Sequence, residues 1–374
     1  MPKMTVQKKR EILLRMCQLG DAIKKDELLV QNFVQERLSY IPHKKLYKFR
    51  ECTNDNFETL SENCIWMPPA NRFSDLFDST INIDFRRNQK EVEEWLNNQF
   101  PVLCFEFSKK LCEDLGQPIP YTHDDFLEYT YTCLDENGDP IAEKEEAFLR
   151  KHTTQENLAG MDETLQQLKL LRVKFAEHQP EMFKAVVDTI EQIRGRMREV
   201  QLTYCMTEGN DNRGLWENYA GKYTGFCIEY SFERWRELPF QDYKNLAFLF
   251  PITYRKTRPY FNMVPFMDGA FRGHLYKDPS WQKNPELNTD LNMQLYYKHK
   301  DYEFEHEWRF SIKNAGNSKQ YFPFVNALYA GKDIKEENLE KLCGIAERLS
   351  VPLHRQVVNK FGNGFDYIQV NRGS

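Results

Sequence analysis

The sequence predicts an α+β protein with a mixed, mainly antiparallel sheet core and an inserted helical hairpin or bundle. Patterns typical of β-strands occur at residues 46–50 and 64–67, and they resume at residue 200. Between these regions, residues 86–199 are mostly polar and carry apolar residues at helical spacing. A chain of 374 residues with 41% hydrophobic residues is long enough for one domain with an insertion, or for two domains.

The change of pattern along the chain divides it into three predicted parts. They are N-terminal helices over 1–43, a mixed α+β catalytic-type domain over 44–85 and 200–374, and a helical insertion over 86–199. In the first part, two apolar stripes of helical period are separated by a break at Gly20 and Asp21. In the insertion, two apolar helix faces separated by Gln179-Pro180 predict an antiparallel hairpin. These faces comprise Leu165, Leu168, Leu171 and Phe175, then Met182, Val186, Ile190, Ile193, Met197 and Val200.

The elements after residue 200 alternate between strand patterns and short helices. We predict strands at 200–206, 226–230, 304–312, 327–330 and 365–370, an edge strand at 248–254, a helical turn at 215–220, and a helix at 335–349. The edge strand is assigned because Pro251 cannot donate a hydrogen bond to a neighbouring strand. Residues 261–295 are expected to be rich in loops, because Asp278-Pro279 and Asn284-Pro285 interrupt them.

Composition limits the class of protein. The net charge of −5 argues against a general affinity for nucleic acid, which needs a basic face. Nine scattered cysteines without a CxxC pair indicate a reduced protein, and therefore a cytoplasmic one. The N-terminus lacks the apolar run of a signal peptide. The longest apolar run, near 246–252, is too short to span a bilayer, so we expect no membrane partner.

The segment from Glu303 to Arg309 is the strongest candidate for a functional centre. On a strand, Glu303, Glu305, Glu307 and Arg309 would share one face, and aromatic residues would occupy the other. Adjacent carboxylates repel unless something binds between them, which suits a ribose hydroxyl or a cationic transition state. We predict Glu307 and Glu305 as the catalytic pair. The alternative is an ordinary strand with a solvated face and a buried face.

Two other groups are candidates for cofactor binding. Lys48 and Arg50 lie two residues apart on a predicted strand with Tyr47, so their charges could hold a diphosphate or its ribose. Trp216 and Tyr219 lie three apart on a helical turn, so their rings could stack on a nicotinamide. An edge strand with a basic face and simple core packing are the respective alternatives.

The remaining observations concern a polar loop and the absence of several known motifs. Asn71, Asp75 and Asp78 could bind a metal or cap a helix. The sequence contains no GxGxxG, GxxxxGK[ST], HExxH or GxSxG, which removes support for Rossmann, P-loop, zincin and α/β-hydrolase functions.

The motifs in order resemble those of an uncharacterised bacterial family, numbered 2971 among the domains of unknown function. They are Leu46-Tyr47-Lys48-Phe49-Arg50, Asn71 to Asp78, Leu215-Trp216-Glu217-Asn218-Tyr219-Ala220 with Gly225 to Tyr230, and Glu305-His306-Glu307-Trp308-Arg309. The resemblance covers roughly 44–85 and 200–370. It departs at the loop, where Ser74-Asp75-Leu76 replaces Asn-Asp-Pro.

The layout of this family is similar to that of a reduced ADP-ribosyltransferase, and the analogy implies the following roles. Arg50 would hold the ribose or phosphate of NAD, and Tyr219 with Trp216 would flank nicotinamide. Glu307 would stabilise the oxocarbenium ion, and Glu305 would position an acceptor macromolecule. We therefore expect NAD-dependent ADP-ribosyl transfer, in phage defence or as a toxin.

Two alternatives remain open. One is a metal-dependent nuclease or phosphoesterase that uses the carboxylates of Asp75, Asp78, Glu305 and Glu307. The other is a non-catalytic sensor or protein-interaction module that binds a partner through the helices of residues 86–199.

Overall fold

The computed structural model describes residues 3–20, 25–73, 75, 78–116, 122–133, 135, 141–152, 181, 184, 187–313 and 318–370. The chain forms two compact units. Unit 1 comprises Met1–Asn82, Arg194–Pro259 and Asn288–Ser374, and unit 2 comprises Ile83–Ile193 and Tyr260–Leu287. Unit 1 holds an eight-stranded sheet, so the prediction of a mixed fold with a mainly antiparallel sheet is confirmed.

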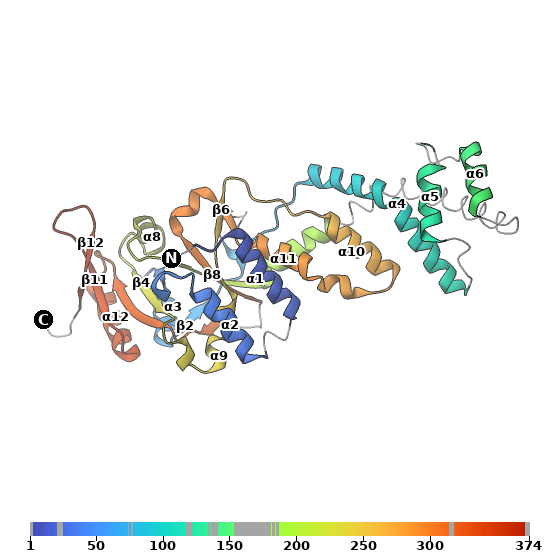
Figure 1. Ribbon diagram of the computed structural model, residues 1–374. Coiled ribbons are helices and arrows are strands. Elements are labelled where there is room, and N and C mark those ends of the chain that lie inside the picture. Colours follow the sequence, from blue (N-terminus) through green and yellow to red (C-terminus); the bar gives the residue numbers. More distant parts are fainter. Residues whose placement is uncertain are drawn as a thin grey trace. The chain divides into compact units, whose positions relative to one another are not determined.

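The strand order in the large sheet is β12-β11-β10-β4-β1-β3-β8-β5. Of these strands, β12, β11, β4 and β8 are labelled in Figure 1. Every neighbouring pair is antiparallel except β10 and β11. The strands are β1 (Lys45–Arg50), β3 (Gln201–Thr207), β4 (Phe226–Ser231), β5 (Leu249–Pro251), β8 (Glu307–Lys313), β10 (Val325–Ala330), β11 (Leu353–Val358) and β12 (Phe365–Gln369). Two further pairs are β2 (Cys64–Trp66) with β9 (Lys319–Tyr321), and β6 (Thr253–Arg255) with β7 (Tyr297–His299).

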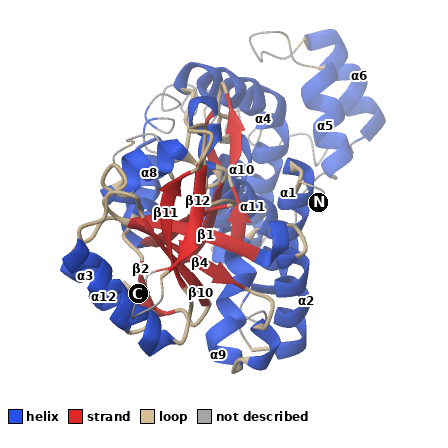
Figure 2. Ribbon diagram, turned by 90° about the vertical axis from the view of Figure 1, so that its left-hand side faces the viewer, coloured by secondary structure: helices blue, strands red, loops and turns tan. Residues whose placement is uncertain are grey.

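Helices pack around this sheet. Figure 2 shows α3 and α12 to one side of the strands and α1 and α2 to the other. The α-helices assigned at least partly to unit 1 are α1 (Val6–Leu19), α2 (Glu27–Leu38), α3 (Asn54–Ser61), α8 (Arg213–Tyr219), α9 (Phe240–Tyr243), α11 (Pro285–Gln294) and α12 (Glu336–Leu349). Within the described residues, the 3₁₀ helices of unit 1 are η2 (Pro42–Lys44), η3 (Ala70–Arg72), η4 (Trp235–Glu237), η5 (Lys244–Phe248) and η7 (Lys300–Glu305).

The two N-terminal helices begin and end where their capping residues predict. The side chain of Thr5 accepts a hydrogen bond from the main chain of Lys8, and Asp26 does the same for Leu29. Gly20 follows α1 with a φ of 51°, a conformation that glycine adopts readily. The predicted helix break at this glycine is confirmed.

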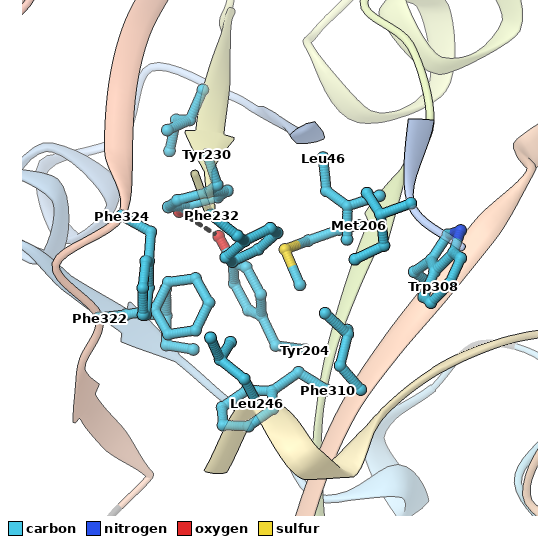
Figure 3. Packing of buried hydrophobic residues seen from close by; sticks show 14 of the residues in the cluster. Leu46, Tyr204, Met206, Tyr230, Phe232, Leu246, Trp308, Phe310, Phe322 and Phe324 are labelled. Atoms are coloured by element: carbon cyan, nitrogen blue, oxygen red, sulfur yellow. Dashed lines mark hydrogen bonds between the residues drawn. The ribbon is translucent and has the colours of Figure 1, made fainter. Parts of the chain in front are cut away.

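The two faces of the sheet differ in polarity. Directly paired residues share a face, so Leu46 with Tyr230, and Met206 with Trp308, lie on one side. Figure 3 shows this side packed with Phe310, Phe322 and Phe324, and with a hydrogen bond of 2.8 Å between the hydroxyls of Tyr204 and Tyr230. The burial of these large rings supplies the main stabilisation of unit 1.

The opposite face carries a row of polar residues across four strands. Glu229 pairs with Tyr47, Tyr47 with Thr207, and Thr207 with Glu307. Glu229, Thr207 and Glu307 are all buried. Buried polar groups need partners, so this face is the candidate location of a functional site.

Unit 2 is helical in its described part. Its described helices are α4 (Phe85–Leu115), α5 (His123–Thr132), α6 (Ala142–His152), α10 (Val264–Leu275) and the 3₁₀ helix η6 (Pro279–Lys283), together with residues 187–193 and the first residues of α11. An ion pair between Arg272 and Glu106 joins α10 to α4. Of the predicted hairpin, 187–200 is helical, whereas 153–180, Met182 and Val186 lie outside the described residues.

Two predictions about the elements between residues 248 and 295 are wrong. Residues 261–295 are not mainly loop, because α10, η6 and α11 occupy most of them. Pro279 and Pro285 open η6 and α11 instead of interrupting the chain, since proline is favourable at the first helical position. The edge strand predicted at 248–254 is two short strands, and β5 with Pro251 is the one at the sheet edge. Strands β7, β9 and β11 were not predicted.

Within the described part of the chain, no helix has both the length and the apolar character needed to cross a membrane.

Candidate functional site

The predicted continuous strand from 304 to 312 does not form, and this change shapes the site. Residues up to Glu305 belong to η7, and β8 begins at Glu307. Between them, His306 adopts a left-handed conformation with a φ of 43°. The imidazole of His299 accepts from the main chain of Asp301 and caps η7, which explains the helical turn. Glu303 is therefore exposed and off the strand, and the predicted row of four charges on one face is wrong.

The turn at His306 directs Glu305 and Glu307 to a common partner, Lys298 on β7. The ammonium nitrogen of Lys298 lies 2.6 Å from Oε2 of Glu305 and 3.0 Å from Oε2 of Glu307. It also lies 3.8 Å from Oδ2 of Asp78. All four side chains are buried. The two predicted catalytic glutamates are thus close neighbours.

Arg309 anchors the other side of this cluster. Its guanidinium donates to Oε1 of Glu307 at 2.5 Å and contacts both carboxylate oxygens of Asp78 at 2.7 Å. It also donates to the hydroxyl of Ser79 and to the main-chain oxygen of Leu295. A guanidinium with this many partners holds the carboxylates in fixed positions.

The pKa values of the two glutamates move in opposite directions. Burial raises the pKa of Glu305, and the negative charge of Glu307 adds to this effect, although Lys298 opposes it. Burial also acts to raise the pKa of Glu307, but Arg309 and Lys298 outweigh it and hold that pKa well below its usual range. Burial acts to lower the pKa of Lys298, yet the charges of Glu307 and Glu305 keep it raised.

Tyr219 reaches the same cluster from the last turn of α8. Its hydroxyl donates to Oε1 of Glu305 at 3.0 Å, and the side chain is 46% exposed. The hydroxyl of Thr207 donates to the main-chain oxygen of Glu305 at 2.6 Å, which fixes the end of η7. Glu305 is therefore positioned by three different elements.

Trp216 lies elsewhere, although it is on the same helix as Tyr219. Its side chain is 0% exposed, and its ring packs edge-on against Phe49 at 5.1 Å between centroids. The indole nitrogen donates to the main-chain oxygen of Asn210 at 2.7 Å. In this arrangement Trp216 packs in the interior and cannot stack on a ligand as the sequence led us to expect.

The residues predicted to form a basic strand, Tyr47, Lys48 and Arg50, do not share one face of the sheet. Tyr47 lies on the polar face, whereas the Nζ of Lys48 and the guanidinium of Arg50 lie 5.1 and 5.3 Å from the ring centroid of Tyr204. Burial, followed by the charge of Arg50, lowers the pKa of Lys48 to about 8.

A cavity of about 350 Å³ joins these groups. Its walls include the cluster residues Asp78, Lys298, Glu305 and Glu307, the rings of Tyr47, Phe49, Phe73, Tyr219 and Tyr302, and the cations Lys48 and Arg72. Within the described part of the chain, neither Lys48 nor Arg72 takes part in an ion pair. Five of the seven predicted site residues therefore line one cavity, and Arg50 and Trp216 do not.

Lys298, Arg72 and the structural role of Arg309 were not predicted from the sequence. Lys298 lies in a short strand that no clear pattern marks, and nothing local links it to the glutamates. Arg309 was treated as a neighbour on a charged face, whereas it is completely buried. An Arg and a Glu two residues apart on a strand lie on the same face. On a buried face, this pattern could have suggested an internal ion pair.

The carboxylates of the cavity are not arranged as a metal site. Among the residues that the structure describes, no group of three or more His, Cys, Asp or Glu side chains could hold a metal ion. The ammonium of Lys298 lies among Asp78, Glu305 and Glu307, where a cation would otherwise bind. The geometry therefore gives no support to the metal-dependent alternative.

Comparison with known proteins places part of the chain in context. The model of a family described as a protein of unknown function (DUF2971) matches residues 215–310. The matched span is shorter than the resemblance predicted from the motifs, but it includes Tyr219, Lys298, Glu305, Glu307 and Arg309. The chain matches no curated protein and no solved structure.

Proposed function

We propose that the cavity binds NAD and that Glu305 and Glu307 promote cleavage of its N-glycosidic bond, with transfer of ADP-ribose to an acceptor. One observation carries this proposal. Two neighbouring glutamates line one cavity, and their environments move their pKa values in opposite directions. In a pair of this kind, one carboxylate stays ionised as a stable anion, and the other can take up and release a proton.

Glu307 supplies the stable anion. Its low pKa keeps it ionised at neutral pH, and its bonds to Arg309 and Lys298 hold it in place. A fixed carboxylate stabilises positive charge on the ribose as the bond between C1′ and the nicotinamide nitrogen breaks. Because two cations already share this carboxylate, orientation of a ribose hydroxyl is expected to be a large part of its contribution.

Glu305 supplies the proton carrier. The nicotinamide leaves as a neutral molecule with the electron pair of the broken bond, so it needs no proton. The acceptor then forms a new bond to C1′ and loses a proton, which ionised Glu305 takes up. A raised pKa makes Glu305 a stronger base than an ordinary carboxylate.

The remaining walls fit the rest of such a ligand. Phe73, Tyr219 and Tyr302 offer flat surfaces for a ring. Lys48 and Arg72 offer positive charge for a phosphate, in the role that the sequence assigned to Lys48 with Arg50. A volume near 350 Å³ lies at the lower end of small-molecule pockets, so it suits one half of a dinucleotide.

The direct test is incubation of the purified protein with NAD, with and without a cell extract as the source of acceptor. Mass spectrometry would follow free nicotinamide, free ADP-ribose and ADP-ribosylated protein. We expect nicotinamide release that is lost in Glu307→Gln and Glu305→Gln. Glu229→Gln is the matched control, because Glu229 is also a buried glutamate of the sheet but does not line the cavity.

Absence of both NAD binding and NAD turnover in the folded protein would overturn the proposal. NAD turnover without transfer of ADP-ribose would limit the proposed reaction to hydrolysis of NAD. NAD consumption of this kind would suit phage defence or a toxin, which requires a test in cells.

A further inference from the structure

Two lysines line the cavity, and their surroundings differ. Lys298 lies 2.6 Å from a carboxylate oxygen of Glu305 and 3.0 Å from one of Glu307. Burial acts to lower the pKa of Lys298, but the charges of Glu307 and Glu305 keep it raised, so this side chain stays an ammonium ion. Lys48, on β1, has no such partner, because no carboxylate of the described residues forms an ion pair with it.

The positive charge of Lys48 is disfavoured where it lies. Its Nζ is 5.1 Å from the ring centroid of Tyr204, and the guanidinium of Arg50 is 5.3 Å from the same centroid, so two cations share one aromatic ring. Burial, followed by the charge of Arg50, lowers the pKa of Lys48 to about 8, and the opposing charges of Cys205, Glu307 and Glu305 do not offset this. Part of the Lys48 population is therefore a neutral amine near neutral pH, and a neutral amine is a nucleophile.

We propose that Lys48 binds a small 2-oxo acid covalently, as an imine between its Nζ and the carbonyl carbon of the ligand. Lysine amines form such bonds with carbonyl compounds where neighbouring cations and burial leave them partly neutral. The cation of Arg72, which also lines the cavity, can hold the carboxylate of such an acid through two parallel N–H groups. A volume of about 350 Å³ is sufficient for a ligand of this size.

The proposed bond forms without an oxidant or a reductant. The lone pair of the neutral amine attacks the carbonyl carbon, and the carbonyl oxygen takes up a proton from the nitrogen, which gives a carbinolamine. The hydroxyl group then takes up a second proton and leaves as water, while the nitrogen loses its remaining proton. Glu305, whose pKa burial raises, lines the same cavity and can donate the proton to the hydroxyl and accept the one from the nitrogen.

The test uses glyoxylate, the smallest 2-oxo acid, with cyanoborohydride, which reduces an imine to a stable secondary amine. Peptide mass spectrometry would compare the rates at which individual lysines of the folded protein are labelled at pH 7. Lys45 is the matched control, because it lies on the same strand but is paired with Glu229 at 2.9 Å. Acetaldehyde, which has a carbonyl group but no carboxylate, is the control for recognition of the acid.

We expect glyoxylate to label Lys48 at least about tenfold faster than Lys45 or Lys298, because a larger fraction of Lys48 is neutral. The preference should disappear in protein unfolded with urea, and it should be weaker with acetaldehyde and in Arg72→Gln. Equal labelling of Lys48 and Lys45 in the folded protein would overturn the inference. A preference for Lys48 that is the same with acetaldehyde, or unchanged in Arg72→Gln, would refute the recognition of an acid.

This inference does not rest on cleavage of NAD, and the outcomes distinguish the two proposals. Selective labelling of Lys48 in a protein that leaves NAD intact would support the imine and remove only the catalytic proposal. Cleavage of NAD by a protein whose Lys48 is not labelled selectively would remove only the imine.

Discussion

Two buried carboxylate clusters lie on the same face of the sheet, and they differ in how their charges are balanced. Around Glu229, one carboxylate meets one ammonium, at 2.9 Å from Lys45, and accepts from Asn326 and from Tyr329. Around Lys298 and Arg309, the three carboxylates of Asp78, Glu305 and Glu307 contact two cations.

The difference shows in the pKa values. Burial acts to raise the pKa of Glu229, but hydrogen bonds from Lys45, Asn326 and Tyr329 outweigh it and lower that pKa. For Glu305, burial raises the pKa, and the single ammonium of Lys298, which Glu305 shares with its neighbours, does not offset this effect. A balanced cluster stabilises the fold, whereas an unbalanced one keeps a group ready to exchange a proton. Position on the sheet alone would not have distinguished them.

The largest expected effect is on activity in the unbalanced cluster. Glu305→Gln removes the proposed base, so we expect kcat for NAD cleavage to fall by about 10²–10⁴-fold. The melting temperature should change little, because the substitution keeps the shape and removes a charge that burial disfavours. Steady-state kinetics and thermal unfolding of the same preparation measure both. An equal loss of activity in Glu229→Gln would contradict the distinction between the clusters.

The largest expected effect on stability comes from Arg309→Met. This change leaves Asp78 and Glu307 buried without their main cation, which costs about 3–5 kcal/mol of unfolding free energy. Urea denaturation would measure the loss. The surface variant Arg234→Met serves as the control, because its ion pair with Glu237 is exposed and its loss is expected to leave the unfolding free energy nearly unchanged.

In the balanced cluster, Glu229→Gln should lower the unfolding free energy by about 1–3 kcal/mol, because it disturbs a complete set of hydrogen bonds. Catalysis should be preserved. Denaturation midpoints and NAD turnover check the two halves of this expectation. Stability equal to that of the wild type would show that the Glu229 charge contributes nothing.

The pH dependence of these variants should differ in sign. The lowered pKa of Glu229 adds stability above the ordinary carboxyl pKa, and this stability is lost as the pH falls through the folded-state value. The raised pKa of Glu305 instead lowers stability as the pH rises from the ordinary carboxyl range through its folded-state value.

At neutral pH, Glu229→Gln should therefore be less stable than the wild type, and Glu305→Gln at least as stable. Both differences should shrink on acidification, by at most about 1.4 kcal/mol per pH unit for each group. Denaturant titrations from pH 4 to 8 would measure them. Differences of the same sign at pH 7 would contradict the assigned pKa directions.

The smallest effect is expected from Tyr219→Phe. Loss of one hydrogen bond to Glu305, about 0.5–1.5 kcal/mol, should reduce activity by tenfold or less. Because this hydroxyl acts to lower the pKa of Glu305, its removal should move the acidic limb of the activity profile to higher pH. An unchanged pH profile would mean that Tyr219 has no influence on Glu305.

The fold was predictable to the extent that its elements carry a local pattern. The N-terminal helices, the strands β1, β3 and β4 of the large sheet, and helix α12 all show apolar periodicity or capping residues. The helices near Pro279 and Pro285 were missed because proline both ends and begins helices, and only tertiary contacts decide which.

Most residues of the candidate site could be predicted from the sequence, but the way in which the fold brings them together could not. Glu305, Glu307, Tyr219, Tyr47 and Lys48 do line one cavity. However, residues 304–312 were predicted as one continuous strand. In the structure, the left-handed conformation of His306 interrupts this segment, and no local sequence rule required that conformation. Lys298 became visible only through contacts with β8 and η7, which depend on the assembled fold.

The order of the strands has a consequence for synthesis of the chain. Strand β1 lies between β3 and β4, which follow it in sequence only after the whole of 83–193 has been made. On the ribosome, both edges of β1 stay unpaired until β3 and β4 have been made, and unpaired strand edges are prone to aggregation. The helices α4, α5 and α6, which lie between β1 and β3 in sequence, can meanwhile begin to form from local contacts. Synthesis should therefore leave the polar face of the sheet incomplete until late, so that a truncated chain would carry β1 without a cavity.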